Sequence, residues 1–475
     1  MRTPCCALTL LLVWAPWAAG QDAATAQGRQ LLEPLLEPLE PGVQAAAEFL
    51  TVPGKLLGAI TPYTSPLNNA LRKALAQNAA TQFTSDIVSG LSDVFRALQN
   101  VTLPMPPPIR PDTEAPQFGF LAEGHDVTTS DGYILSLFRV RSAQCDAYRA
   151  VVVIPPAFFV NAASFMFLKN ESLVHRLVRR CFDVWLTSCR GDLFGRRHVT
   201  LSDTDQKFWD FTPAEWGVYD LPVQLEFVSK ATGSTRLRLV GLDTAGTALF
   251  FMNHAHGQRY QRLLASCYLF GPFGYLSHLD ATLYLLLAKR RDLLTAIGAF
   301  ALHDELAFMN PVVHATLYNL CGRFSPLTCK YLILLLEGQS DEVDETTFPY
   351  MFRNFFDSTS ITAFDYLVNL VGKPKYMAFY DYGAEDNLRR YGQKSAPEVH
   401  LNATTVPCAF FALGTSAVVR PEDTLDTYNA LSESARRHYE VLPGFNGLSP
   451  MFPRHPDLAY NGVIDLLEKD LEQYP

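Results

Sequence analysis

The segment GLDTAG, residues 241–246, lies between two apolar stretches and carries a glycine at each end. Hydrolases often expose a nucleophilic serine on such a turn between a strand and a helix, in the pattern G-x-S-x-G. No serine occurs in this turn. Counting forward from Gly241 places Asp243 at the nucleophile position, and counting back from Gly246 places Thr244 there. The sequence therefore predicts a turn of this kind with a different residue at its apex.

Short apolar segments on both sides of the turn predict the strands that position it. Four of them are residues 150–156, 182–186, 236–241 and 267–272. They alternate with stretches of helical periodicity, which is typical of a mostly parallel sheet flanked by helices. Residues 127–140 predict a hairpin with a Ser-Asp-Gly turn. The expected fold class is therefore α/β.

Residues 278 to about 378 have helical patterns, and strand-like segments resume at 407–414 and 439–445. We therefore expect a helical cap inserted before the last two strands, over the edge of the sheet where open α/β sheets bind ligands. The predicted organisation is a signal peptide (1–20), an N-terminal helical and proline-rich extension (21–116), the first part of the core (117–277), the cap (278–378) and the last part of the core (379–475).

The first 20 residues have one arginine, a short apolar run and small residues up to Gly20, which is typical of a secretory signal peptide cleaved near that glycine. No later apolar run is long enough for a membrane span. The expected location is secreted or endolysosomal. The extension that follows either packs on its own protein or offers residues 21–110 to a protein or lipid partner.

Seven cysteines remain after the signal peptide, an odd number that leaves at least one thiol outside any internal disulfide. Cys321 and Cys329 are the pair that we expect to form a disulfide, because a short polar loop separates them. Three sequons predict glycosylation at Asn100, Asn170 and Asn402. All three features fit an oxidising compartment.

The net charge of −9 and the absence of a basic cluster argue against a nucleic-acid partner. No CxxC pair occurs, so a zinc site is not expected. We expect no metal and no cofactor.

Several short strings then identify a family. They are DGYIL (131–135), DVWL (183–186), RGDLFGRRH (190–198), FWDF (208–211), YDLP (219–222) and DYG (381–383) with Asn387 and Tyr391. In order and spacing they resemble the acid lipase family, which includes gastric and lysosomal acid lipases. The resemblance covers roughly residues 117–470. It implies an α/β-hydrolase fold with a helical cap, and an ancestral hydrolysis of triacylglycerols or cholesteryl esters.

The resemblance also assigns the positions at which that reaction needs a nucleophile, a histidine and a carboxylate. The spacing from YDLP places Asp243 at the serine position, and a frame shifted by one residue places Thr244 there. The family context P-x-Y-N-H-L-D corresponds to PGFNGLS, with Gly447 at the histidine position. Ser416 stands at the position of the carboxylate, and Asp423 is the nearest acid that could replace it.

The loop that should stabilise the oxyanion is also altered, because Pro156, Ala157 and Phe158 stand where the family has a His-Gly pair. Proline lacks an N–H, and alanine resists the backbone angles that glycine adopts. A pocket for an acyl chain has as its candidate lining Phe158, Phe159, Phe165 and Phe167, side chains that would otherwise be ordinary core.

Two interpretations remain open. The first is a lipase-like protein without catalytic activity, which binds a lipid or fatty-acyl ester or has a structural role. The alternative is an active lipase or esterase that uses Asp243 or Thr244 with a relocated histidine, either His438 or His455.

Overall fold

The computed structural model describes residues 106–289, 336–355 and 357–473, with short stretches between 304 and 333. The signal peptide, the extension up to residue 105 and most of the cap lie outside these residues, and so do Asn100 and Cys329. Predictions for those segments stay predictions. In the part of the chain that is described, no helix is long and apolar enough to cross a membrane.

The described residues contain a nine-stranded sheet with the order β1-β2-β4-β3-β6-β7-β10-β11, in which β5 pairs with β2. The strands are β1 (Leu121–Thr128), β2 (Tyr133–Arg141), β3 (Ala150–Ile154), β4 (Phe182–Thr187), β5 (Arg197–His198), β6 (Leu237–Leu242), β7 (Leu264–Phe270), β10 (Cys408–Leu413) and β11 (Arg436–Leu442). From β4 to β11 the neighbours are parallel, and the hairpin of β1 and β2 joins antiparallel. The chain therefore has the α/β-hydrolase fold that the sequence predicted.

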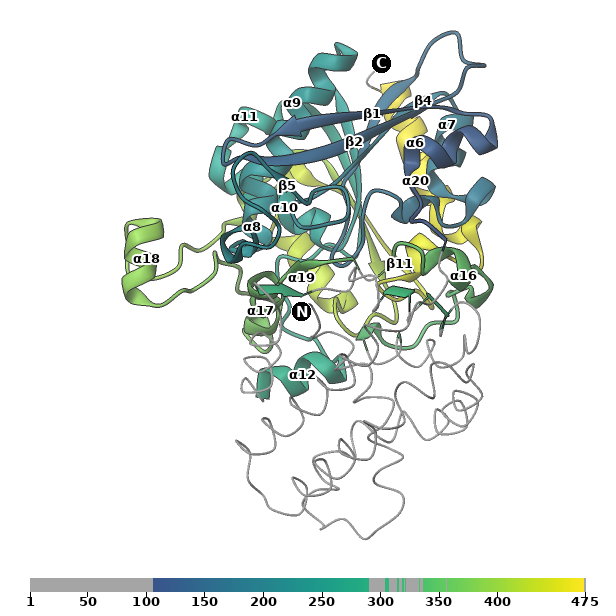
Figure 1. The fold of residues 1–475 in the computed structure, drawn as a ribbon. Helices are drawn as coiled ribbons and strands as arrows, with labels where there is room; N and C mark the ends of the chain where they lie inside the picture. The colour runs from purple at the N-terminus through teal and green to yellow at the C-terminus, as the bar shows by residue number, and fades with distance from the viewer. Residues whose placement is uncertain are drawn as a thin grey trace, which may run out of the picture.

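Helices cover both faces of the sheet (Figure 1). One face carries α9 (Leu221–Thr232), α10 (Thr244–His256) and α11 (Gln258–Gln261), and the other carries α7 (Leu173–Arg179) and α20 (Pro456–Gln473). The side chains of β3 divide between two buried clusters, with Val152 and Ile154 in one and Val151 and Val153 in the other. This division follows from the alternation of side chains along a strand, and it explains why β3 is apolar throughout.

The remaining described elements are mostly short. They are α6 (Pro111–Glu114), α8 (Pro213–Glu215), α12 (Thr282–Lys289), α16 (Phe348–Met351), α17 (Ile361–Leu370), α18 (Ala384–Tyr391) and α19 (Pro421–Ala430), with β8 (Glu305–Leu306) and β9 (Thr359–Ser360) as a small second sheet. The elements from α12 to α18 lie between β7 and β10 in the sequence, so the insertion precedes the last two strands as expected.

A disulfide joins Cys145, in the connection between β2 and β3, to Cys181, which precedes β4. The sequence did not single out this pair. Cys321 is disulfide-bonded, but its expected partner lies outside the described residues. The sequons at Asn170 and Asn402 have exposed asparagines.

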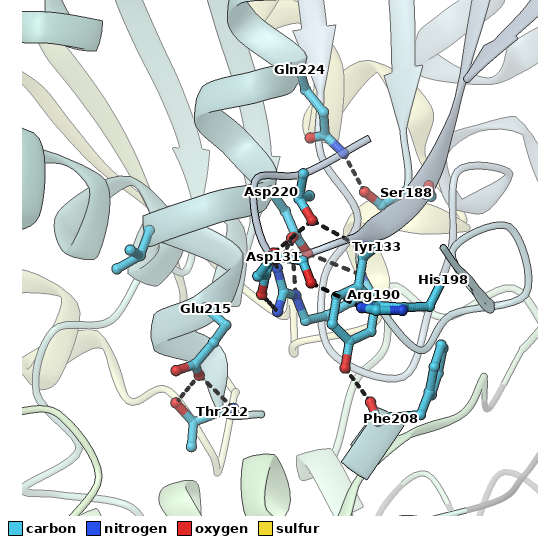
Figure 2. A network of polar contacts seen from close by, with 12 residues as sticks. Asp131, Tyr133, Ser188, Arg190, His198, Phe208, Thr212, Glu215, Asp220 and Gln224 are labelled. Carbon is cyan, nitrogen blue, oxygen red and sulfur yellow. Dashed lines mark hydrogen bonds and ion pairs between the residues drawn. The ribbon is translucent and has the colours of Figure 1, made fainter. Parts of the chain in front are cut away.

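A buried ion network holds together the loops beside the sheet (Figure 2). The guanidinium of Arg190 is 2% exposed and contacts Asp220 at 2.7 Å and Asp131 at 2.6 Å. The same guanidinium lies 4.1 Å from the ring centroid of Tyr133, whose hydroxyl donates to the carbonyl of Phe208. Each of these five residues belongs to a string that carries the family resemblance. Four of the six strings, DGYIL, RGDLFGRRH, FWDF and YDLP, therefore contribute to one network.

We expect Asp220→Asn to lower the free energy of unfolding by about 3 kcal/mol, because it removes a counter-charge from a buried cation. Urea unfolding followed by circular dichroism measures the change. The matched control is Asp457→Asn, since Asp457 pairs with Arg176 but is 73% exposed. Its expected effect is within about 0.5 kcal/mol. Equal losses in the two variants would contradict a supporting role for the network.

Candidate functional site

The turn between β6 and α10 has a strained backbone, and Asp243 is the strained residue. Its φ of 51° and ψ of −114° are angles that side chains other than glycine seldom adopt. Such a residue costs about 1–3 kcal/mol and persists only when its surroundings impose the conformation. The Asp243 N–H donates to the carbonyl of Phe270 at 2.9 Å, and its carbonyl accepts from the N–H of Gly246 at 3.1 Å. Thr244 is the first residue of α10.

Both glycines of GLDTAG are needed for close packing. A Cβ on Gly241 would lie 2.6 Å from the Cβ of Ala245, and a Cβ on Gly246 would lie 2.5 Å from the Cβ of Pro272. Either side chain would push the first turn of α10 away from its neighbours. The side chain of Ala245 fits here because residue 241 has none.

The turn faces the loop that follows β3 across a point where the strand order reverses. β3 pairs with β4 on one side and with β6 on the other, so the connections after β3 and β6 diverge and leave a crevice between them. Ala157, Phe158 and Phe159 from one loop and Asp243 from the other line a single cavity there. Phe159 also has a positive φ, of 59°.

We name this space the elbow cavity. Its lining consists of Ala157, Phe158, Phe159, Leu242, Asp243, Gly271, Tyr284, Glu337, Leu367, Leu413, Val418, Val419, Gly447, Leu448 and Met451. Its volume is about 30 Å³, which is room for about two water molecules. Apart from two carboxyl groups and one phenol, the side chains that line it are apolar.

Glu337, from the end of the cap, takes the space next to Gly447. A Cβ placed on Gly447 would lie 2.1 Å from Oε2 of Glu337, so the carboxyl group stands where a side chain at residue 447 would begin. The backbone beside it is fixed at two points. Ala417 donates its N–H to the carbonyl of Glu337 at 2.9 Å, and the Asn446 side chain donates to the carbonyl of Gly338 at 2.9 Å.

Burial shifts both acids of the elbow cavity toward their protonated forms. Burial raises the pKa of Asp243 to about 7, although a hydrogen bond from the Thr244 backbone opposes the change, and Oδ1 of Asp243 is buried without a hydrogen-bond partner. Burial, and then the charge of Asp243, raise the pKa of Glu337 well above its usual range. Burial and both acids raise the pKa of Tyr284, on α12. Among the described lining residues, no cation and no histidine faces these groups.

The two residues considered for the carboxylate position, both after the end of β10, lie elsewhere. Ser416 is fully buried, and its hydroxyl accepts from the N–H of Val419 at 3.1 Å. Asp423, also fully buried, accepts from Nδ1 of His278 at 2.9 Å and from two backbone N–H groups. Neither residue lines the elbow cavity. Asp423 thus keeps a histidine partner, but this pair is not brought together with Asp243.

The histidines of the alternative interpretation have other partners. His438 lies 3.4 Å from Glu440 and its ring contacts Phe411, and His455 lies 3.0 Å from Glu342 with 60% of its side chain exposed. Neither lines the elbow cavity.

The four phenylalanines divide into two groups. Phe158 and Phe159 line the elbow cavity, with ring centroids 4.4 Å apart. Phe165 and Phe167 are 3% and 1% exposed and belong to the hydrophobic core, away from the cavity lining. Pro156 does not line the cavity either. No group of three or more potential metal ligands occurs in the described residues.

Sequence reasoning missed Glu337, Tyr284 and His278. A signal for Glu337 was present, because it ends the apolar run ILLLE and is the single charged residue of that run. Nothing in the sequence places it beside Gly447, however, since the contact depends on how the cap returns to the sheet.

Comparisons with known proteins agree with the resemblance. Residues 114–166 match the family model described as a partial alpha/beta-hydrolase lipase region. The chain is 27% identical to human lipase member N over 364 residues, covering 74% of this chain and 88% of that protein. It is 24% identical to human gastric triacylglycerol lipase over 363 residues, covering 74% and 89%. The chain is therefore similar, as a distant homologue, to the acid lipases.

Among solved structures, a thermophilic esterase from Thermogutta terrifontis is 13% identical, with 73% of this chain and 99% of that chain covered and a TM-score of 0.38. A hydrolase from Pseudomonas aeruginosa is 14% identical, with 73% and 98% covered and the same TM-score of 0.38. Because these identities and TM-scores are low, the fold assignment rests on the strand order of the sheet in this chain.

We expect Gly447→Ala to lower the free energy of unfolding by about 1–2 kcal/mol, because the new methyl group must displace the Glu337 carboxyl group. In a Glu337→Ala background the cost should fall to near zero. A double-mutant cycle measured by urea unfolding isolates this coupling. The same cost in both backgrounds would show that residue 337 does not fill this space.

Proposed function

We propose that this chain is a secreted lipase-like protein that does not hydrolyse esters and acts by binding or as a structural component. One observation carries the proposal. The space beside Gly447 is filled by the carboxyl group of Glu337, and no histidine in the described residues lines the cavity with Asp243. Ester hydrolysis by a nucleophile of this kind needs a base that accepts its proton and returns it to the leaving alcohol.

Asp243 is also a poor nucleophile in its present surroundings. Because its pKa is raised to about 7, its reactive carboxylate form is the minor one in an acidic compartment. The neighbouring Glu337 has a raised pKa as well, so it is a neutral acid or an anion and never a positive group that would activate a carboxylate. The electrostatics of the cavity therefore oppose both nucleophilic attack and the stabilisation of an oxyanion.

The alternative is an esterase that uses Asp243 or Thr244 with His438 or His455. No contact in the described residues favours it, because each histidine is paired with a glutamate outside the elbow cavity. It predicts turnover of a short-chain ester that Asp243→Ala or Thr244→Ala abolishes.

The bound ligand, if the role is binding, would be a lipid or fatty-acyl ester, as the resemblance implies. A cavity of about 30 Å³ has no room for an acyl chain while Glu337, Phe158 and Phe159 stay in place. The small volume of the elbow cavity supports a structural role in the conformation described. Lipid binding requires one of these three side chains to move out of the cavity. Residues 21–110 stay the candidate segment for a protein contact.

We expect the purified mature protein to show no hydrolysis of short-chain or long-chain esters between pH 4 and pH 8, and no labelling by a fluorophosphonate probe. The reason is the missing serine and the missing base. A gastric triacylglycerol lipase treated in parallel is the positive control. Turnover that survives in both Asp243→Ala and Thr244→Ala would indicate a contaminating enzyme, whereas turnover lost in either variant would establish the alternative.

Lipid extraction and mass spectrometry of the same preparation separate the two non-catalytic roles. A stoichiometric acyl lipid indicates binding. A preparation free of lipid, before and after incubation with triacylglycerol vesicles, indicates a structural role.

A further inference from the structure

We propose that Glu337 and Asp243 share one proton across the elbow cavity and form a pH-dependent latch, which holds the end of the cap against the carboxyl edge of the sheet. This goes beyond the proposed function and does not depend on it, because the latch would operate whether or not the cavity binds a ligand.

The two acids come from different parts of the fold. Asp243 is fixed at the apex of the turn between β6 and α10, and its buried Oδ1 has no hydrogen-bond partner. Glu337 is the last helical residue before Gly338, whose φ of 88° ends the helix. Both line a cavity with room for about two water molecules. A proton that bridges the two carboxyl groups, directly or through a water molecule, gives this oxygen of Asp243 a hydrogen bond.

Among the described residues, the groups that face this pair give it no counter-charge. The loop after β3 contributes Ala157, Phe158 and Phe159, and α12 contributes Tyr284. The remaining described lining side chains, from β6, α17, β10 and the loops after β10 and β11, are apolar: Leu242, Leu367, Leu413, Val418, Val419, Leu448 and Met451. Tyr284 is the only other titratable group among the described lining residues, and it is a neutral phenol whose pKa is raised.

Two carboxyl groups in an apolar cavity cannot both ionise without a large cost, so at least one proton stays bound at acidic pH. The folded pKa values of both acids are raised, and stability from the pair is therefore fully present below about pH 4 and is lost as the pH rises through about 7. Once both are charged, Glu337 is the group that can leave, because its longer side chain comes from the end of the cap, whereas Asp243 is held in the turn between β6 and α10.

The backbone contacts of Glu337 make the opening measurable at a single amide. The Ala417 N–H donates to the Glu337 carbonyl, so this hydrogen bond breaks when the end of the cap withdraws. Global unfolding is a less specific measurement, because Asp192 and Asp357 form a second buried pair of acids with raised pKa values. The Asp357 carboxylate accepts from Asn161 and Leu193 and does not line the elbow cavity.

The test is hydrogen exchange of the Ala417 amide in the full mature chain from pH 5 to pH 8, corrected for the intrinsic exchange rate. We expect the opening equilibrium of the wild type to rise by up to about tenfold per pH unit in the range where the shared proton is lost. In Glu337→Gln and in Asp243→Asn this slope should become smaller, because each variant keeps one acid whose pKa burial still raises, and in the double variant it should disappear. Asparagine tolerates a positive φ, so the second variant keeps the turn.

Asp341→Asn is the matched control, because Asp341 is an exposed carboxylate four residues after Glu337 and outside the elbow cavity. It should keep the wild-type slope. A wild-type opening equilibrium that does not change with pH overturns the latch, and so does a slope that both cavity variants retain undiminished. If Glu337→Gln fails to fold, the comparison of the slope in the wild type with the slope in Asp243→Asn tests the latch by the same criterion.

Discussion

The buried charge of Arg190 is the interaction on which the loops around the candidate site depend. A guanidinium that is 2% exposed is tolerated only with counter-charges, and Asp131 and Asp220 supply them. Asp131 lies in the turn of the β1–β2 hairpin, and Asp220 immediately precedes α9. Three loops far apart in the sequence are thereby fixed relative to one another. The strings that carry the resemblance around these residues therefore have a structural role.

The turn at Asp243 is held in place by its backbone and its close neighbours. Its strained backbone is imposed by the close approach of Gly241 to Ala245, by that of Gly246 to Pro272 and by two backbone hydrogen bonds. None of these constraints involves the side chain at the apex. A serine can therefore be replaced there by an aspartate at little structural cost, and its partners are then free to change.

The space beside Gly447 links the end of the cap to the sheet. Gly447 has no side chain, and the carboxyl group of Glu337 lies where one would begin. The described lining of the cavity is therefore mostly apolar and carries two acids. Burial links this arrangement to pH, because it raises the pKa values of Asp243 and Glu337 together.

The sequence by itself determined the local elements: the buried strands, the hairpin at its Ser-Asp-Gly turn, the insertion before β10 and the turn that holds Asp243. Periodicity and turn residues encode such elements, because each depends on neighbours along the chain. It did not determine which distant side chains meet. Glu337 beside Gly447, His278 on Asp423, the Cys145–Cys181 disulfide and the placing of Phe165 in the core were decided by tertiary packing. Such contacts depend on how whole layers and the cap are arranged, and no short pattern records that.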